Sequence, residues 1–142
     1  MRDVASQLPA RRYPTDRKVT DSVKSVKRYG VFLDVLFLLL FVGIGRRTHH
    51  DGGAIAGFAN TLWPFAAGLL AGWLLTRWAH RNPLTPSSGL LIVLTTVALG
   101  MALRVVSGQG TALSFIIVAI LFLSIFLVGW RFVLSLFSGR RP

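Results

Sequence analysis

The chain has 142 residues, 53% of them apolar, with a formal net charge of +11 and no cysteine. A mean hydropathy of +0.60, with the charges gathered in a few segments, indicates a polytopic membrane protein and excludes a soluble globular domain. The absence of cysteine excludes disulfides and thiolate chemistry, and the positive charge fits attraction to anionic lipid better than nucleic-acid binding.

Residues 1–28 form a basic tail ahead of the first apolar run. Val19, Val23 and Val26 share one helical face and are surrounded by lysine and arginine, which predicts a short amphipathic helix near 18–28 on the inner leaflet. The preceding part of the tail is expected to be disordered. No small-residue cleavage site follows the first apolar run, so we expect a retained helix and not a removable signal peptide.

Four continuous apolar runs are each long enough to span a membrane as a helix, which takes about 20 residues. None shows the alternation of a barrel strand, so the sequence predicts an all-α, polytopic domain over 29–136 with a short C-terminal tail, 137–142. The four predicted spans are 29–45, 54–75, 89–106 and 112–136.

The basic residues predict the orientation. Of the 16 lysines and arginines, all but Arg46, Arg47 and Arg104 lie in the N-terminal tail, between the second and third spans, or at the C-terminal end. The positive-inside rule then places both termini in the cytoplasm, in a multi-pass protein of the cell (cytoplasmic) membrane.

Asp34 is the one acidic residue within a predicted span, about one turn from the cytoplasmic boundary. A carboxylate in a membrane span needs a partner, and we expect a structural ion pair with Arg77, with Arg81 and Lys27 as alternatives. A proton-coupled antiporter would need a deeper carboxylate.

Pro64 lies inside the second span, where it removes one backbone hydrogen bond and predicts a kink. Asn60 and Thr61 lie on the preceding turn. They can satisfy the freed backbone groups, bond a neighbouring helix, or form a substrate site of the kind that transporters build beside broken helices.

Small residues recur at four-residue spacing along the second span, which predicts close helix packing. The pattern does not say whether the partner helix belongs to the same chain. The residues are Gly53, Gly57, Gly68 and Gly72.

The second half of the chain resembles the first, which predicts an internal repeat of two helical hairpins. Such hairpins would be related by a pseudo-two-fold axis along the membrane normal, and Arg104 would then lie at the same outer boundary as Arg47. The matching pairs include Gly43 with Gly100, Arg47 with Arg104, Phe65 with Phe122, Gly72 with Gly129, and Trp73 with Trp130.

The stretches "FVGIGRRTHH", "WPFAAGLLAGW" and "GMALRVVSGQGTALSFIIVA" resemble the DUF3054 family of small, four-helix prokaryotic membrane proteins. The resemblance extends from about Asp34 to Arg131. It implies a membrane location and a four-helix unit, but no activity and no functional residue.

Arg47, Arg104, Gln109 and Thr111 would gather at the outer face if the repeat holds. Two guanidinium groups there would suit a phosphate, a carboxylate or a lipid headgroup. The alternative is that they anchor the helix ends to lipid phosphates and pair with Asp51. In "SGQGT" the glycines predict a tight turn, and the Thr111 hydroxyl is expected to cap the fourth helix.

The sequence offers no paired deep carboxylates, no nucleophile beside a base and no metal cluster, so we expect neither an enzyme nor a cofactor. Two functions remain open. One is a small permease, channel, or anion- or lipid-binding protein, working as a homo-oligomer. The other is an accessory or scaffold subunit of a larger membrane complex.

Overall fold

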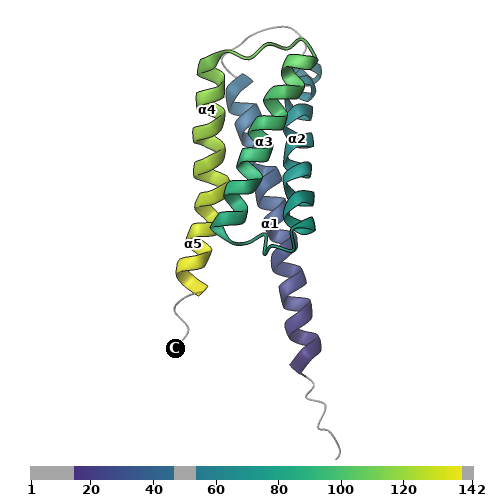
Figure 1. The fold of residues 1–142 in the computed structure, drawn as a ribbon, viewed down its shortest axis with the longest axis vertical. Coiled ribbons are helices and arrows are strands. Elements are labelled where there is room, and N and C mark those ends of the chain that lie inside the picture. The colour runs from purple at the N-terminus through teal and green to yellow at the C-terminus, as the bar shows by residue number, and fades with distance from the viewer. Residues whose placement is uncertain (1–14, 47–53, 139–142) are drawn as a thin grey trace, which may run out of the picture.

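The computed structural model describes residues 15–46 and 54–138, so the predictions about Arg47 and Gly53 lie outside the described residues. The predicted all-α fold of four helices is confirmed (Figure 1). The fourth helix is one rod made of α4, a π-helical turn at Ser124–Val128, and α5. The helices are α1 (Thr15–Arg46), α2 (Ala54–Trp78), α3 (Pro86–Val106), α4 (Leu113–Leu123) and α5 (Gly129–Ser138).

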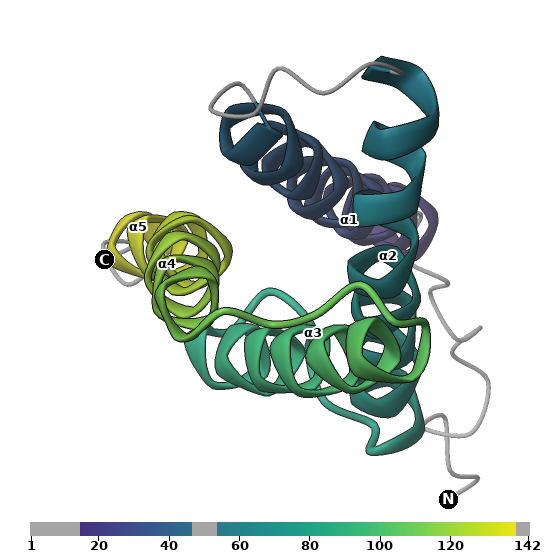
Figure 2. The same cartoon turned by 90° about the horizontal axis from the view of Figure 1, so that it is seen from above.

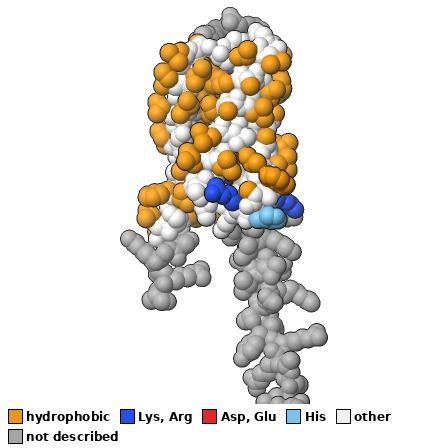
Figure 3. Space-filling model, in the orientation of Figure 1, with side chains coloured by type: hydrophobic (Ala, Val, Ile, Leu, Met, Phe, Trp, Pro, Cys, Tyr) orange, Lys and Arg blue, Asp and Glu red, His pale blue; other side chains and the backbone are white. Residues whose placement is uncertain are grey.

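Three stretches are long and apolar enough to cross a membrane, namely Ile55–Trp78, Pro86–Val106 and Leu113–Phe137. In α1 the apolar stretch is shorter, Tyr29–Gly45. Hydrophobic side chains are spread over the bundle surface seen in Figure 3, and many large ones are exposed, as a protein solvated by lipid requires. Length and composition therefore support a membrane protein.

The sequence predicted a separate amphipathic helix near 18–28, but in the structure this segment is the first part of α1. This helix begins at Thr15 and continues without a break to Arg46, over 32 residues, and it extends beyond the other helices (Figure 1). No proline interrupts this segment, and its lysines, arginines and leucines favour a helix. The basic segment and the first span are therefore one helix.

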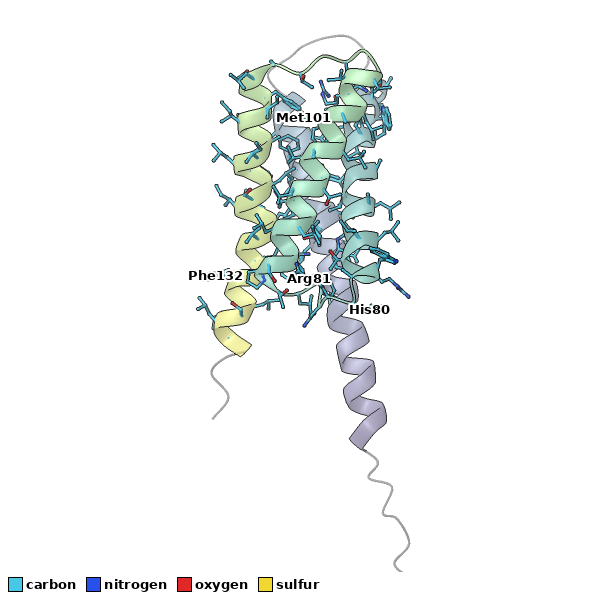
Figure 4. The ribbon with its side chains drawn as sticks, viewed as in Figure 1. His80, Arg81, Met101 and Phe132 are labelled. Carbon is cyan, nitrogen blue, oxygen red and sulfur yellow. The ribbon has the colours of Figure 1, made fainter. Side chains whose placement is uncertain are left out.

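The two ends of the bundle differ in what they contain. α1 begins, α5 ends and the connection 79–85 lies at one end, which we call the termini end (Figure 1). Figure 4 places His80 and Arg81 there and Met101 towards the opposite end, which we call the far end. The connection 107–112 lies at the far end.

Close packing of α2 on α3 uses two of the predicted packing glycines. A Cβ atom on Gly68 would lie 2.6 Å from the Thr96 carbonyl oxygen, and one on Gly72 would lie 3.1 Å from the Ile92 Cα. A Cβ atom on Gly68 would clash with backbone, and one on Gly72 would be unusually close to it, so the helix that meets these residues is α3 of the same chain.

Phenylalanine rings fill the middle of the bundle, between the four helices that Figure 2 shows from above. Phe41 of α1 is the centre of this aromatic core, and its ring centroid lies 5.5 Å from that of Phe65, 5.8 Å from Phe115 and 5.6 Å from Phe122. Rings at these separations and tilts attract one another beyond simple burial. Aromatic rings thus fill the centre of the bundle between its two ends.

Candidate functional site

Arg104 lies in the last turn of α3, where two glycines turn the chain back towards α4. Gly108 and Gly110 have φ values of +71° and +68°, which favour glycine, and the amide of Gln109 donates to the Arg104 carbonyl at 2.9 Å. The tight turn predicted for "SGQGT" is therefore present. It folds residues 109–111 back over the Arg104 side chain.

The Arg104 guanidinium is held by neutral oxygen atoms. Nη1 donates to Gln109 Oε1 at 3.0 Å, Nη2 to the Gln109 carbonyl at 3.4 Å, and Nε to the Gly110 carbonyl at 3.3 Å. The guanidinium carbon also lies 4.7 Å from the centroid of the Phe115 ring. Among the residues that the structure describes, no carboxylate pairs with Arg104, so these contacts position its charge without neutralising it.

The polar residues beside the α2 proline belong to this same end of the bundle. Gln109 Nε2 donates to Asn60 Oδ1 at 3.2 Å, and the Thr61 hydroxyl donates to the Gly57 carbonyl at 3.0 Å. Asn60 thus bonds the connection after α3. Pro64 itself is buried, one turn further along α2.

A pocket of about 460 Å³ opens beside Arg104 at the far end, and we call it the Arg104 pocket. Its volume lies within the range of small-molecule sites. The lining combines polar groups with aromatic and aliphatic walls, and comprises Phe41, Val42, Gly45, Thr61, Arg104, Gln109, Gly110, Thr111, Ala112 and Phe115.

The pocket brings together residues that the sequence placed in two separate sites, Thr61 of the kink and the group of Arg104, Gln109 and Thr111. One detail was wrong. Ala112, and not Thr111, is the N-cap residue of α4, and because alanine has no side-chain oxygen, no side chain caps that turn. Thr111 lines the pocket instead. The convergence of Arg47 with Arg104 stays a prediction.

The partner predicted for Asp34 was also wrong. Asp34 forms a two-pronged ion pair with Arg131 of α5, with Nη2 to Oδ2 at 2.6 Å and Nη1 to Oδ1 at 2.8 Å. Both side chains are 0% exposed, whereas Arg77 is exposed. The Arg77 side chain is exposed, whereas the long Arg131 side chain reaches Asp34 from α5, a helix that itself packs on α3.

Two tryptophans complete the coordination of the Asp34 carboxylate. Trp73 Nε1 donates to Oδ2 at 3.0 Å and Trp130 Nε1 donates to Oδ1 at 2.9 Å. We call these residues, Asp34, Trp73, Trp130 and Arg131, the Asp34–Arg131 cluster. The sequence marked Asp34 as a carboxylate that needs a partner, and the match of Trp73 with Trp130 in the predicted repeat was the one signal for the other members of this cluster.

Further contacts fix Arg131 from behind. Its Nε donates to the Pro83 carbonyl at 2.8 Å, and its Nη1 also donates to the Leu127 carbonyl in the π-helical turn. A Cβ atom on Gly89 would lie 2.7 Å from Arg131 Cδ, so the glycine leaves room for the arginine stem. The guanidinium carbon lies 4.4 Å from the centroid of Trp130.

A family model described as a protein of unknown function (DUF3054) matches residues 31–134. Neither the curated proteins nor the solved structures gave a match. The matched range contains all four residues of the Asp34–Arg131 cluster and every residue that lines the Arg104 pocket.

Proposed function

The chain belongs to the DUF3054 family, and since the description of that family names no activity, we propose a function from the geometry: the protein binds an oxyanion in the Arg104 pocket. The ligand is a phosphate or carboxylate group, either on a free molecule or on a lipid headgroup. The observation that carries the proposal is a guanidinium that lines an open pocket and bonds only neutral oxygens among the described residues.

The hydrogen bonds of Arg104 leave donors for a ligand. A guanidinium has five N–H groups, and the three bonds to Gln109 and Gly110 use one on each nitrogen. One N–H therefore remains on Nη1 and one on Nη2. A guanidinium with free N–H donors suits the oxygens of a carboxylate or phosphate.

The walls of the pocket favour an anion that carries an organic body. A cavity of about 460 Å³ is far larger than a bare phosphate, and Phe41, Val42 and Phe115 supply apolar contacts beside the polar rim. These apolar groups also exclude water, which strengthens the attraction between Arg104 and an anion.

Binding is favoured over a permanently open channel. The aromatic core of Phe41, Phe65, Phe115 and Phe122 fills the bundle immediately beneath the pocket, and Phe65 is 0% exposed. The accessory-subunit alternative depended on the α2 glycines as a surface for another protein. It is now less well supported, because Gly68 and Gly72 pack on α3 of the same chain.

The distribution of charge supports an outer position for the pocket. The exposed residues Arg77 and Arg81 lie at the termini end, where the basic N-terminal tail enters the bundle, and Arg104 lies at the other end. Under the positive-inside rule the termini end faces the cytoplasm of a cytoplasmic membrane, with anionic lipid around its basic residues, and the Arg104 pocket opens outside.

The test compares Arg104→Gln with Arg77→Gln, which removes the same charge from an exposed side chain at the termini end. Each protein is placed in phosphatidylcholine nanodiscs and titrated with inorganic phosphate and with acetate. A second arm uses phosphatidylglycerol nanodiscs and counts retained lipid by native mass spectrometry, which also reports the oligomeric state. We expect Arg104→Gln to weaken binding in one arm by about tenfold or more, as the loss of a charged hydrogen-bond donor does.

The arm that responds identifies a free anion or a headgroup as the ligand. Equal binding by Arg104→Gln and Arg77→Gln in both arms would overturn the proposal. The proposal would also be overturned if the wild-type protein binds neither probe but the Asp51→Asn variant binds one of them. The Asp51 carboxylate would then be the anion that Arg104 binds.

A further inference from the structure

An apolar groove of about 300 Å³ lies between α1 and α2, and we call it the α1–α2 groove. Its floor is formed by Leu38 and Leu69, which are 2% and 4% exposed, and its rim includes the exposed residues Val35 and Leu70. Ala66, one turn before Leu70 on α2, is also exposed, and its small side chain leaves space there. Among the described residues, no lining side chain is shared with the Arg104 pocket.

Contacts beside the groove hold its two walls in place. Trp73 lines the groove, and its indole N–H donates to Asp34 of α1 at 3.0 Å, so the ring is held in one orientation and its carbon atoms are left to line the groove. Further along the two helices, the ring centroids of Phe41 and Phe65 lie 5.5 Å apart. The floor residue Leu38 lies one turn from both Asp34 and Phe41 on α1. The groove is therefore preformed between two fixed contacts.

The length of the groove matches one leaflet of a bilayer. At 1.5 Å per residue, Val31 and Leu39 lie about 12 Å apart along α1, and Leu62 and Trp73 lie about 16 Å apart along α2. Half of the hydrocarbon core of a bilayer is about 15 Å. Val31 and Trp73 are at the end of the groove nearer the termini end, because α1 begins and α2 finishes there (Figure 1). The groove therefore extends over the depth of the leaflet at the termini end.

Positive charge follows the groove at that end. Positions 27 and 28 precede Val31 by four and three residues in the unbroken helix α1, so they lie one turn nearer the termini end on the same helical face. The sequence supplies Lys27 and Arg28 at these positions. If the groove lies at the depth of the acyl chains, these positions lie at the depth of the headgroups. The phosphate of an anionic lipid has the complementary charge.

A second copy of the chain fits this surface less well than a lipid does. Nine described residues line the groove, whereas a stable protein interface takes about 20–30 residues on each side. A helix with its side chains is about 10–12 Å across, whereas an acyl chain is a single row of methylene groups. Two copies in the same orientation would also bring their basic α1 segments together, and like charges repel.

We propose that the α1–α2 groove binds one acyl chain of an anionic phospholipid from the leaflet at the termini end, with the lipid phosphate beside positions 27 and 28. An unfilled groove would leave its lining atoms without contacts, and an acyl chain supplies those contacts. Lipid tails are as apolar as leucine, so the chain contributes shape and the headgroup charge contributes the preference for one class of lipid. This site is separate from the Arg104 pocket and does not depend on it.

The experiment fills the groove and counts the lipid that remains. Ala66→Phe places a ring in the groove, and Ala102→Phe places one at an exposed position of α3 that lines neither cavity. Every protein carries Arg104→Gln, so that the Arg104 pocket does not contribute. Each is reconstituted in nanodiscs with equal amounts of phosphatidylglycerol and phosphatidylcholine and analysed by native mass spectrometry, at an activation energy that removes loosely held lipid. We expect the protein with Ala102→Phe to keep one phosphatidylglycerol molecule and the protein with Ala66→Phe to lose it.

A second pair of variants tests the charge. Lys27→Gln combined with Arg28→Gln should lower the preference for phosphatidylglycerol over phosphatidylcholine by about tenfold, because basic residues near the membrane surface attract anionic lipid. Arg17→Gln combined with Lys18→Gln removes the same charge from α1 about 15 Å further from the groove and should leave the preference unchanged.

Equal lipid retention by the Ala66→Phe and Ala102→Phe proteins would overturn the proposal, as would equal retention of the two lipids by a protein that keeps Lys27 and Arg28. A dimer that Ala66→Phe dissociates and Ala102→Phe does not would show that a second copy occupies the groove instead. Should Ala66→Phe fail to fold, Ala66→Leu fills less of the groove and should still weaken retention relative to Ala102→Leu. The absence of any difference between these two leucine variants would contradict the proposal.

Discussion

Glycines that look alike in the sequence have different surroundings in the bundle. Gly72 and Gly129 are matched in the predicted repeat, yet a Cβ atom on Gly72 would meet Ile92, whereas one on Gly129 would meet nothing within 4 Å. Gly68 is the tightest glycine of α2, with the Thr96 backbone on its open side. Its absent side chain is therefore required by packing, whereas that of Gly129 is not.

We predict that Gly68→Ala destabilises the protein by about 1–3 kcal/mol, because the new methyl group lies 2.6 Å from a backbone oxygen that cannot rotate away. Gly129→Ala should be neutral or stabilise by up to about 1 kcal/mol, since alanine favours a helix and has room. Unfolding by dodecyl sulfate in mixed micelles measures both. Equal losses of stability would show that α2 and α3 are not as close as described.

The ends of the helices position the polar residues of both sites. α3 ends at paired glycines, which bring Gln109 onto Arg104, and α2 ends at a turn that directs Pro83 towards Arg131. In the α2 turn the Arg81 amide donates to the Thr76 carbonyl and the His80 amide to that of Arg77, both at 3.1 Å. This is a Schellman motif with histidine, at φ +52°, in the place where glycine is usual.

We predict that His80→Gly raises the free energy of unfolding by about 1 kcal/mol, because glycine adopts this left-handed conformation without the cost that a side chain incurs. His80→Ala is the control, since it removes the imidazole but keeps a Cβ atom, and it should gain nothing. The same micellar titration distinguishes the two. A gain of equal size from alanine would mean that the imidazole, and not the backbone, is unfavourable.

At the scale of the whole molecule, polar groups lie at the two ends and aromatic rings fill the middle. The Asp34–Arg131 pair joins α1 to α5 across 97 residues of sequence at the termini end, and Gln109 joins the connection 107–112 to Asn60 at the far end. Between them Phe41 contacts rings from α2 and α4. The aromatic rings thus separate the polar groups of one end from those of the other.

The absence of cysteine makes the orientation simple to test. Ala79 and Ala112 are exposed alanines at opposite ends of the bundle, and either becomes the single cysteine of the chain when substituted. We predict that Ala112→Cys reacts with a membrane-impermeant maleimide added to intact cells, and that Ala79→Cys reacts only after the cells are permeabilised. The reverse pattern would place the Arg104 pocket on the cytoplasmic side.

The sequence by itself determined the membrane class, the four helices and the tight turn at "SGQGT", because span length, apolarity and glycine conformation are local properties. It also marked Asp34, Arg104, Gln109 and Thr61 as polar residues that need an explanation. Only the tertiary structure decided which residues meet. Arg131 and not Arg77 pairs with Asp34, and α3 receives the α2 glycines, because hydropathy fixes neither the rotation of a helix about its axis nor the order of helices around the bundle.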